Sequence, residues 1–318
     1  MPELVTLGET MILFSPESAG PLRYVDRFER RAAGAESNVA IALTRLGHSA
    51  GWISRLGDDE FGQYILQSLR GEGVDVSRVR IDPEHPTAVM FRERGLMGRV
   101  DVVYYRKGSA ASFLSPDDLD RDYICAARVL HITGITPALS ESCRRAVFQA
   151  VHWAREAGVT ISFDPNLRLK LWSLSEARDV LGELTSLSDI VLIGLDEGER
   201  LFDCRGEDAL AAAVLERGAS TVVIKLGTRG ARLQRASETV HVPAFQVPQV
   251  VDPVGAGDGF DAGFLAGWLK GWSMEDCLRL GALVGALAVT VPGDVEGYPT
   301  MRQVERYWAA EASVDVLR

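Results

Sequence analysis

Short apolar runs alternate with longer stretches whose apolar positions recur at helical spacing along most of the chain. Residues 129–133 and 190–193 are typical of the short runs, and residues 256–270 are typical of the longer stretches. Strands that alternate with helices in this way indicate a mainly parallel sheet flanked by helices. The pattern therefore predicts a doubly wound α/β fold. Strands are expected at 4–7, 11–14, 51–56, 129–133, 159–163, 190–193 and 221–226, and helices at about 39–46, 60–70, 140–156, after Trp172, 197–202, 208–217, 256–270, 274–289 and 300–310.

Two β-rich runs, at residues 87–94 and 100–106, interrupt this alternation. Residues 95–98 between them include glycines, so the two runs are expected to form a hairpin. A hairpin inserted between α/β units is not expected to join the main sheet, and we assign it to a small β lid. We expect a single domain over residues 1–318, with a discontinuous lid formed by about 10–32 and 86–108.

Composition narrows the classes of protein and partner. The chain has 318 residues and 47% hydrophobic content, which is enough for a sizeable core. Its formal net charge is -10 and it has no run of lysines and arginines, so neither nucleic acid nor a membrane surface is an expected partner. The cysteines are widely scattered, which is typical of reduced thiols. The N-terminus lacks a signal-peptide pattern, and the longest apolar run, at 282–291, is too short to cross a membrane, so we expect a cytoplasmic protein.

Polar residues follow several of the expected strands. In a doubly wound sheet, ligands bind beyond the carboxyl ends of the strands, so these residues are candidates for one shared site. The candidates are Glu9, 164–168, 196–197, 225–230 and 251–260. Their recurrence at the same end of successive strands predicts a binding site there.

Residues 251–260 carry the most specific chemistry. Small residues there precede an apolar run at helical spacing, which predicts the start of a helix close to Gly255. The first N–H groups of a helix have no internal acceptor, so they suit a phosphate or a developing oxyanion. Asp258 is then either a charge at the helix start or a base directed at the bound group.

Two other nucleotide-binding patterns do not fit this stretch. A dinucleotide fingerprint requires a third glycine where this chain has Phe260. A Walker loop requires a lysine, and none follows Gly259. An NAD-dependent dehydrogenase is therefore disfavoured.

Residues 252–258 resemble the D-x-x-G-A-G-D signature of the PfkB, or ribokinase-like, carbohydrate kinases. The order of motifs from 34–38 to 293–297 is similar to that of this family over nearly the full length. The segments most similar to the 2-keto-3-deoxygluconate kinases are 104–110, 131–138 and 164–168. The resemblance implies a ribokinase-like fold and transfer of phosphate from ATP to the terminal hydroxyl of a sugar acid, which gives a 6-phosphate.

The resemblance also implies roles at the transferred phosphate. Phosphoryl transfer requires a base for the acceptor hydroxyl and positive groups around the phosphate oxygens. Asp258 is the expected base. The expected anion hole consists of the amides of Gly255, Ala256 and Gly257. Arg168 either contacts the γ-phosphate or is an ordinary surface arginine.

Further residues are implied in ATP binding. Lys225, Gly227 and Gly230 resemble the nucleotide loop of the family, although a strand followed by a tight turn has the same pattern. Ala282 departs from the family, in which an asparagine is common beside the nucleotide. The set expected at the nucleotide is Asn166, Arg168, Lys225, Gly227, Gly230, Gly255 and Gly257.

The sugar end favours an acidic substrate. Ribokinase-like and fructokinase-like members usually carry an aspartate after the first strand, whereas residues 11–14 here are apolar. Arg106 would pair with a substrate carboxylate through two hydrogen bonds. For a hairpin taken in isolation, the pattern favours Tyr104 and Arg106 as one face of a half-exposed strand over a role in binding. Met90 replaces a tyrosine that is common in the deoxygluconate kinases. The expected sugar contacts are Gly34, Asn38, Tyr104, Arg106, Asp258 and Asp294.

Mg²⁺ is the expected counter-ion of ATP, held by nucleotide oxygens, waters and few protein carboxylates. Glu197 resembles the acid of the N-x-x-E motif of the family and is expected near the metal through water, unless it is only a helix-start acid. Gly194 replaces the asparagine of that motif, and Asn166 is the candidate to replace part of its function.

Two alternatives use the same fold. One is a kinase for a neutral sugar such as fructose or ribose. The other is a non-catalytic sugar-binding relative, which the changes at Gly194 and Ala282 favour and the intact Asp258 disfavours. Because uncovered sheet edges pair with other edges, the lid is expected to join subunits into a homodimer or a larger homo-oligomer.

Overall fold

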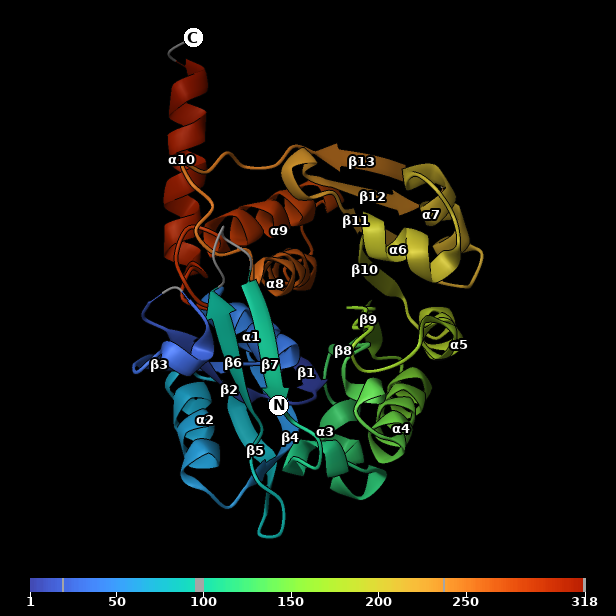
Figure 1. The fold of residues 1–318 in the computed structure, drawn as a ribbon. Coiled ribbons are helices and arrows are strands. Elements are labelled where there is room, and N and C mark those ends of the chain that lie inside the picture. The colour runs from blue at the N-terminus through green and yellow to red at the C-terminus, as the bar shows by residue number, and fades with distance from the viewer. Residues whose placement is uncertain (19, 95–99, 237, 317–318) are drawn as a thin grey trace.

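A large sheet organises the fold. The computed structural model describes residues 1–318 except 19, 95–99, 237 and 317–318. Within these residues the large sheet has nine strands in the order β13-β12-β11-β10-β9-β8-β1-β4-β5 (Figure 1). Pairing is parallel from β11 to β5 and antiparallel at β12 and β13. The strands are β1 (Leu4–Leu7), β4 (Ala50–Gly57), β5 (Asp75–Asp82), β8 (Val129–Thr133), β9 (Thr160–Asp164), β10 (Ile190–Gly194), β11 (Thr221–Lys225), β12 (Ala231–Arg235) and β13 (Glu238–Val242).

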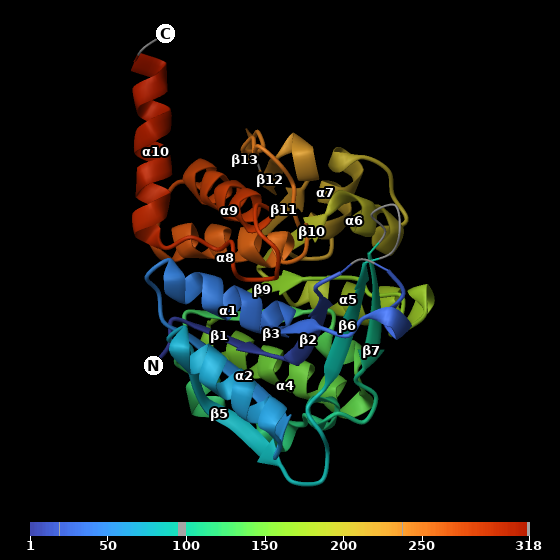
Figure 2. The same cartoon turned by 60° about the vertical axis from the view of Figure 1, so that its left-hand side comes forward.

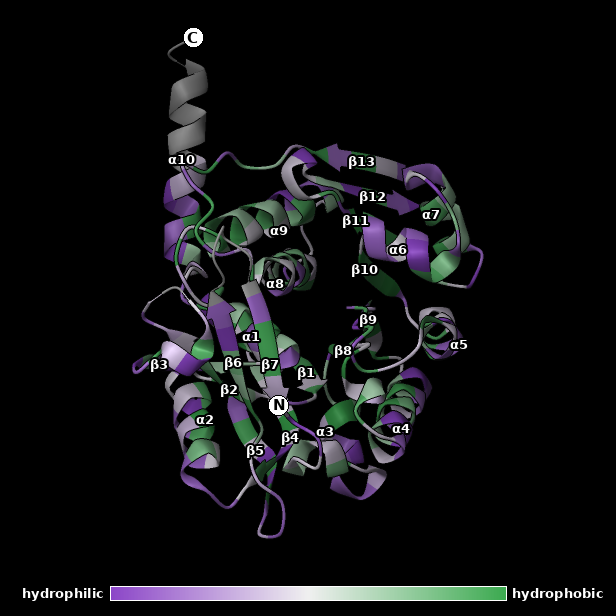
Figure 3. Cartoon of the chain, viewed as in Figure 1, coloured by the Kyte–Doolittle hydropathy of each residue, from purple (hydrophilic) through white to green (hydrophobic). Residues whose placement is uncertain are grey.

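Helices cover both faces of this sheet because successive side chains of its strands point to opposite sides. In β10, Ile190 and Leu192 pack in the core on one face, and Val191 and Ile193 pack in the core on the other. The hydropathy colouring of Figure 3 shows apolar strands between the helical layers. The first face is covered by α1 (Ala35–Arg45), α2 (Glu60–Gly71), α8 (Ala256–Leu269) and α9 (Met274–Ala288), and the second by α3 (Arg121–Cys125), α4 (Glu141–Ala157), α5 (Leu174–Ser186), α6 (Leu195–Phe202) and α7 (Glu207–Leu215).

The last helix, α10 (Met301–Val316), packs against the core of the first face through Val304 and Trp308, and its C-terminal part projects beyond these layers (Figure 1). Among the described residues no helix combines the length and the apolar character needed to cross a bilayer.

The predicted α/β fold is confirmed, and the differences concern polar strands. Strand β5 was not predicted because its sequence DVSRVRID alternates only weakly and is half-exposed. Strands β12 and β13 form an antiparallel hairpin at the sheet edge, where exposed polar residues dilute the apolar pattern. The helix expected at about 300–310 continues to Val316.

A second, four-stranded sheet, the small sheet, forms the expected β lid. Its order is β3-β2-β6-β7, and it is mixed, because β2 pairs with β6 in parallel while the other pairs are antiparallel. The predicted hairpin of β6 and β7 is confirmed, whereas its connection at 95–98 lies outside the described residues. Figure 2 shows the small sheet beyond the carboxyl ends of the parallel strands. Its strands are β2 (Met11–Pro16), β3 (Phe28–Ala33), β6 (Val89–Arg94) and β7 (Val100–Tyr105).

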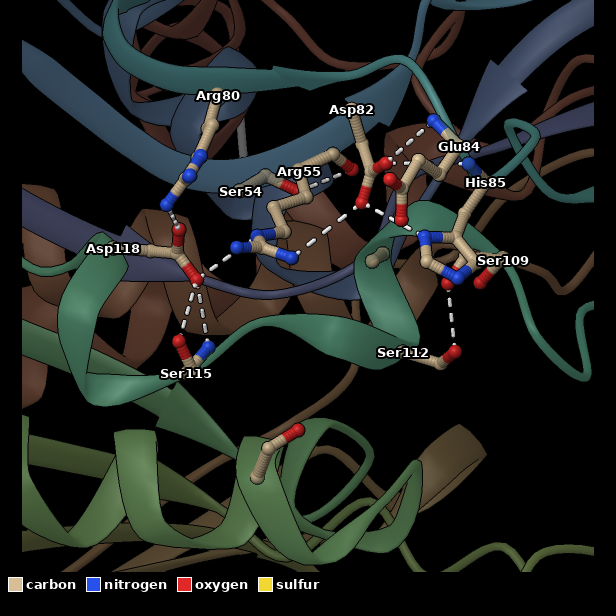
Figure 4. Close-up of polar contacts among 12 residues, drawn as sticks. Ser54, Arg55, Arg80, Asp82, Glu84, His85, Ser109, Ser112, Ser115 and Asp118 are labelled. Atoms are coloured by element: carbon tan, nitrogen blue, oxygen red, sulfur yellow. Dashed lines mark hydrogen bonds and ion pairs between the residues drawn. The ribbon is translucent and has the colours of Figure 1, made fainter.

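A polar network fixes the segments before β6 and after β7 to the main sheet. Figure 4 shows Arg55 between two carboxylates, with its Nη1 3.4 Å from Asp82 Oδ2 and its Nε 2.9 Å from Asp118 Oδ2. His85 Nδ1 lies 3.1 Å from the same Asp82 oxygen, and its ring stacks on Phe113 at 3.8 Å between centroids. The segments that lead into and out of the β6–β7 hairpin are therefore both fixed to the main sheet.

Candidate functional site

A cavity of about 480 Å³ lies between the small sheet and the carboxyl ends of the parallel strands. Its wall includes the residues that directly follow or end different strands, among them Glu9, Asp164, Gly194 and Lys225. The sequence-based expectation of one shared site at this edge of the sheet therefore agrees with the geometry. The expected residues that line this cavity are Gly34, Asn38, Tyr104, Arg106, Asn166, Arg168, Glu197, Lys225, Gly255, Gly257, Asp258 and Asp294.

A second cavity, of about 370 Å³, adjoins the first and shares Lys225, Pro253 and Gly257 with it. The remaining expected residues, Gly227, Gly230 and Ala256, line this second cavity. Most of its wall is apolar. The apolar side chains include Phe245, Val247, Val250, Phe260, Ala282 and Val289. An apolar cavity beside an anion-binding helix start suits a flat, weakly polar group such as a nucleotide base.

The start of α8 separates the two cavities. Gly255 adopts a positive φ of 79°, and a Cβ at this position would overlap the carbonyl oxygen of Asp294. The Gly255 carbonyl also accepts a hydrogen bond from the Tyr298 hydroxyl at 2.7 Å. The first regular helical bond runs from Gly259 N–H to Gly255 O at 2.8 Å, so the preceding amides have no acceptor within the helix. Gly255 thus sets the backbone that presents these amides to an anion.

Asp258 lies in the first turn of α8 and faces the first cavity. Its Oδ2 accepts a hydrogen bond from Asn38 Nδ2 at 2.7 Å. Removal from water raises the pKa of Asp258 to about 7, opposed by the Asn38 hydrogen bond and reinforced by the charges of Asp164 and Asp294. A carboxyl that ionises near neutral pH in a ligand cavity has the properties of a general base.

Lys225 is held between two buried carboxyl groups. Its Nζ donates to Asp164 Oδ2 at 3.0 Å and to Asp261 Oδ1 at 3.1 Å. Burial alone would lower the pKa of Lys225, but these carboxyls raise it above its ordinary value. Burial raises the pKa of Asp261 well above its ordinary value, and we assign the proton that it shares with Asp164 to Asp261. Sequence analysis placed Lys225 at the nucleotide but missed Asp261.

Arg92 was also missed, and it connects the small sheet to the start of α8. Its side chain is 5% exposed and pairs with Asp252 and with Asp294, whose Oδ1 lies 3.3 Å from Arg92 Nη2. Burial raises the pKa of Asp294 to about 6, although Arg92 opposes this shift. The only signal in the sequence was a basic residue at an inward position of the hairpin.

The wall of the first cavity near Arg106 holds buried acids, namely Glu9, which sequence analysis named only as a general site candidate, and Glu36, which it did not name. Residues 11–14 carry no carboxylate, as expected, but Glu9 lies two residues before Met11 and pairs with Arg106, whose Nη2 lies 2.6 Å from Glu9 Oε2. Glu36 also lines the cavity, and its Oε1 accepts hydrogen bonds from Thr133 and Thr136 at 2.6 and 2.7 Å. Burial raises the pKa of Glu36. Arg106 is therefore not an isolated cation.

The loop after β9 is held by Glu197. Its carboxylate oxygens accept the N–H groups of Gly194 at 2.9 Å and of Leu167 at 3.0 Å. Burial and the charge of Asp164 raise the pKa of Glu197. This contact places Asn166, with a positive φ of 40°, and the exposed Arg168 at the cavity wall. The described residues contain no group of three or more His, Cys, Asp or Glu side chains suited to a metal ion.

Both the sequence and the fold of this chain are similar to those of known carbohydrate kinases. A sequence model described as pfkB family carbohydrate kinase matches residues 1–301. The chain is 42% identical to a 2-dehydro-3-deoxygluconokinase of Bacillus subtilis (strain 168), with 98% of this chain and 97% of that protein covered. It is 40% identical to a protein of the same name from Thermoproteus tenax, with 96% and 94% covered. A solved E. coli structure in complex with ATP and Mg²⁺ superimposes with a TM-score of 0.91 at 29% identity, covering 98% of this chain and 100% of that chain.

We predict that Arg92→Met lowers the free energy of unfolding by about 3–5 kcal/mol, because it leaves Asp252 and Asp294 buried without their cation. Arg80→Met is the matched control, since Arg80 also pairs with a carboxylate but is 58% exposed, and it should cost less than about 1 kcal/mol. Urea denaturation at pH 7 measures both values. Equal small losses would show that the buried Arg92 contacts do not stabilise the fold.

Proposed function

The chain belongs to the pfkB family of carbohydrate kinases, and we propose that it transfers the γ-phosphate of ATP to the terminal hydroxyl of 2-keto-3-deoxygluconate. This sugar acid is the 2-dehydro-3-deoxygluconate in the names of the two sequence relatives. The observation that carries the proposal is the position of Asp258, a carboxyl with a pKa of about 7 that lies beside the amides at the start of α8 and faces the first cavity.

In this proposal the two substrates occupy the two adjoining cavities. The sugar acid lies in the first cavity, against the small sheet, and the adenine base lies in the apolar second cavity. The phosphates then reach the boundary that the cavities share at Lys225, Pro253 and Gly257. This arrangement brings the γ-phosphate and the sugar hydroxyl to the same helix start, as an in-line transfer requires.

The chain supplies a base and hydrogen-bond donors for the reaction. Asp258 accepts the proton of the attacking hydroxyl, while the Asn38 side chain fixes the orientation of its carboxylate. The amides of Gly255, Ala256 and Gly257 bind the charge that develops on the phosphate oxygens. Arg168 is exposed at the cavity wall, so its guanidinium is free to contact the γ-phosphate when ATP binds.

The donors near the phosphates fit Mg²⁺ held mainly by nucleotide oxygens and waters. Asn166 and Glu197 supply oxygen atoms at the cavity wall, and such hard ligands suit this ion. Both oxygens of Glu197 already accept backbone N–H groups, so we propose contact through water. When bound, the ion neutralises charge on the phosphates.

The sugar side supports an acidic substrate over a neutral one. Arg106 is 12% exposed at the cavity wall, and a guanidinium binds a carboxylate through paired hydrogen bonds. The apolar side chains of Met11, Leu13 and Met90 line the same cavity and offer no carboxylate for sugar hydroxyls.

We also propose that the small sheet joins subunits. The face opposite the cavity carries Phe14, Phe28 and Phe91 in mutual ring contact at 5.0 to 6.3 Å, with Tyr105 against Phe91 at 5.9 Å, and α2 covers the part of this face where Phe14 contacts Phe61. Tyr105 is 64% exposed and Val103 is 38% exposed. A partly exposed apolar face next to a strand edge is typical of contacts between subunits.

We predict that kcat/KM of the wild type rises with pH through about 7, because only the ionised Asp258 accepts a proton. Asp258→Asn should lower kcat by about 10² to 10⁴, abolish this limb of the pH profile and change substrate affinity only a few-fold. A coupled ADP-release assay measures the rates, and calorimetric titration measures binding. Wild-type rates in this variant would eliminate Asp258 as the base.

We predict that the wild type phosphorylates 2-keto-3-deoxygluconate with a higher kcat/KM than fructose or ribose. Arg106→Ala should reduce kcat/KM for the sugar acid by about 10-fold or more and change the values for neutral sugars little, because only the acid loses a charge partner. The same ADP-release assay across a panel of sugars decides this. A preference for neutral sugars would replace the proposed substrate with the neutral alternative.

We predict that the wild type sediments as a dimer or larger assembly and that Val103→Lys combined with Tyr105→Lys shifts it to monomer. Lysines on this face repel one another across a contact between copies. Tyr307→Lys is the control, since Tyr307 is 48% exposed on α10, outside the small sheet. Sedimentation velocity of a purely monomeric wild type would reject the contact.

A further inference from the structure

Among the described residues the Glu9 side chain bonds only to the segment that leaves the small sheet, although Glu9 lies two residues after β1 of the main sheet. Its side chain is 1% exposed in the wall of the first cavity. Its Oε2 accepts from Arg106 Nε at 2.8 Å and lies 2.6 Å from Arg106 Nη2. Its Oε1 accepts from the Ser109 hydroxyl at 2.6 Å. Both oxygens of this buried acid are therefore used to fix residues 106–109.

The contact with Glu9 leaves one edge of Arg106 available. A guanidinium has five N–H donors in one plane, and a carboxylate can bind either along the Nε and Nη2 edge or along the Nη1 and Nη2 edge. Glu9 occupies the first edge with a single oxygen. Among the described residues the Arg106 guanidinium has no other hydrogen bond or ion pair, while the ring of Tyr104 lies 5.6 Å from its guanidinium carbon. The second edge is thus free for a ligand in the cavity.

We propose that Glu9 is a positioning residue for sugar-acid binding, which sets the plane of Arg106 so that its free edge meets the substrate carboxylate. The inference rests on the proposed function, because it requires an acidic substrate. Glu9 itself touches neither reacting atom. Glu9 fixes the conformation of the Arg106 side chain before the substrate binds, so that less conformational entropy is lost on binding.

If only its charge mattered, Glu9 would weaken the binding of the sugar acid instead of strengthening it. A carboxylate beside Arg106 repels the substrate carboxylate and cancels part of the attraction of the guanidinium. If net charge governed binding, removing the charge of Glu9 would always tighten the binding of the sugar acid. If orientation governs binding, shortening the side chain weakens it even when the charge is kept. Two substitutions separate these effects.

Glu9→Asp keeps the charge but shortens the side chain by one methylene, so it can no longer reach Nε and Nη2 together. Glu9→Gln keeps the length, since its amide oxygen can accept both Arg106 donors while its NH₂ group donates to the Ser109 hydroxyl. Ser109→Ala is the control, because it removes the bond to Oε1 and leaves the contact with Arg106 intact.

The experiment measures KM and kcat for 2-keto-3-deoxygluconate, and the inhibition constant of its neutral amide, in the wild type and the variants. We expect Glu9→Asp to raise KM about tenfold, with kcat within about twofold and the amide inhibition constant unchanged. Glu9→Gln and Ser109→Ala should keep KM at or below about twice the wild-type value. Thermal unfolding of each variant confirms that it is folded.

Three results would overturn the proposal. An unchanged KM in Glu9→Asp would show that orientation by Glu9 is irrelevant. Equal increases for the acid and for its amide would show a general structural role. An equal increase in Glu9→Gln would show that the charge of Glu9, and not its reach, matters. A wild type that phosphorylates neutral sugars but not the acid would overturn the proposed function itself, and is recognised before any variant is made.

Discussion

Burial of several carboxyl groups around one cavity is the constraint on which the site depends. A buried carboxylate is costly unless a cation or hydrogen-bond donors compensate it, and otherwise it binds a proton. Lys225 compensates Asp164, and Arg92 lies between Asp252 and Asp294. Asp258 has no paired cation among the described residues and only the amide of Asn38 as a side-chain donor. The neighbouring cations are thus already paired, which leaves Asp258 with the raised pKa that a base requires.

The same ion pairs connect the small sheet to the main sheet. Arg92 lies on β6 and contacts residues that flank the start and the end of the C-terminal helical pair, while Arg106 follows β7 and contacts Glu9 after β1. Residues that line the first cavity therefore also fix the small sheet beside it. A change in the position of the small sheet cannot occur without a change in the charges around Asp258 and Asp294.

Local sequence patterns explain why much of the fold and part of the candidate site could be predicted from the sequence. Apolar periodicity located the strands that are buried on both faces, and small residues followed by an apolar run at helical spacing located the helix start at residues 252–258. Polar strands such as β5 lack that periodicity. Glu9 and Arg106 are 97 residues apart, and Arg92 and Asp252 are 160 apart, so no local pattern reveals these pairs. The residues missed are those whose importance arises only when distant segments meet.

Asp294 is the residue at which these constraints converge. Its carbonyl oxygen occupies the space where a side chain at position 255 would lie, so it forces a glycine with a positive φ at the start of α8. Its carboxyl group pairs with Arg92 of the small sheet and raises the pKa of Asp258 through its charge. The backbone at the start of α8, the position of the small sheet and the ionisation of Asp258 therefore all depend on Asp294. The position of the small sheet and the ionisation of Asp258 are therefore coupled, because displacing Arg92 alters the charge around Asp258.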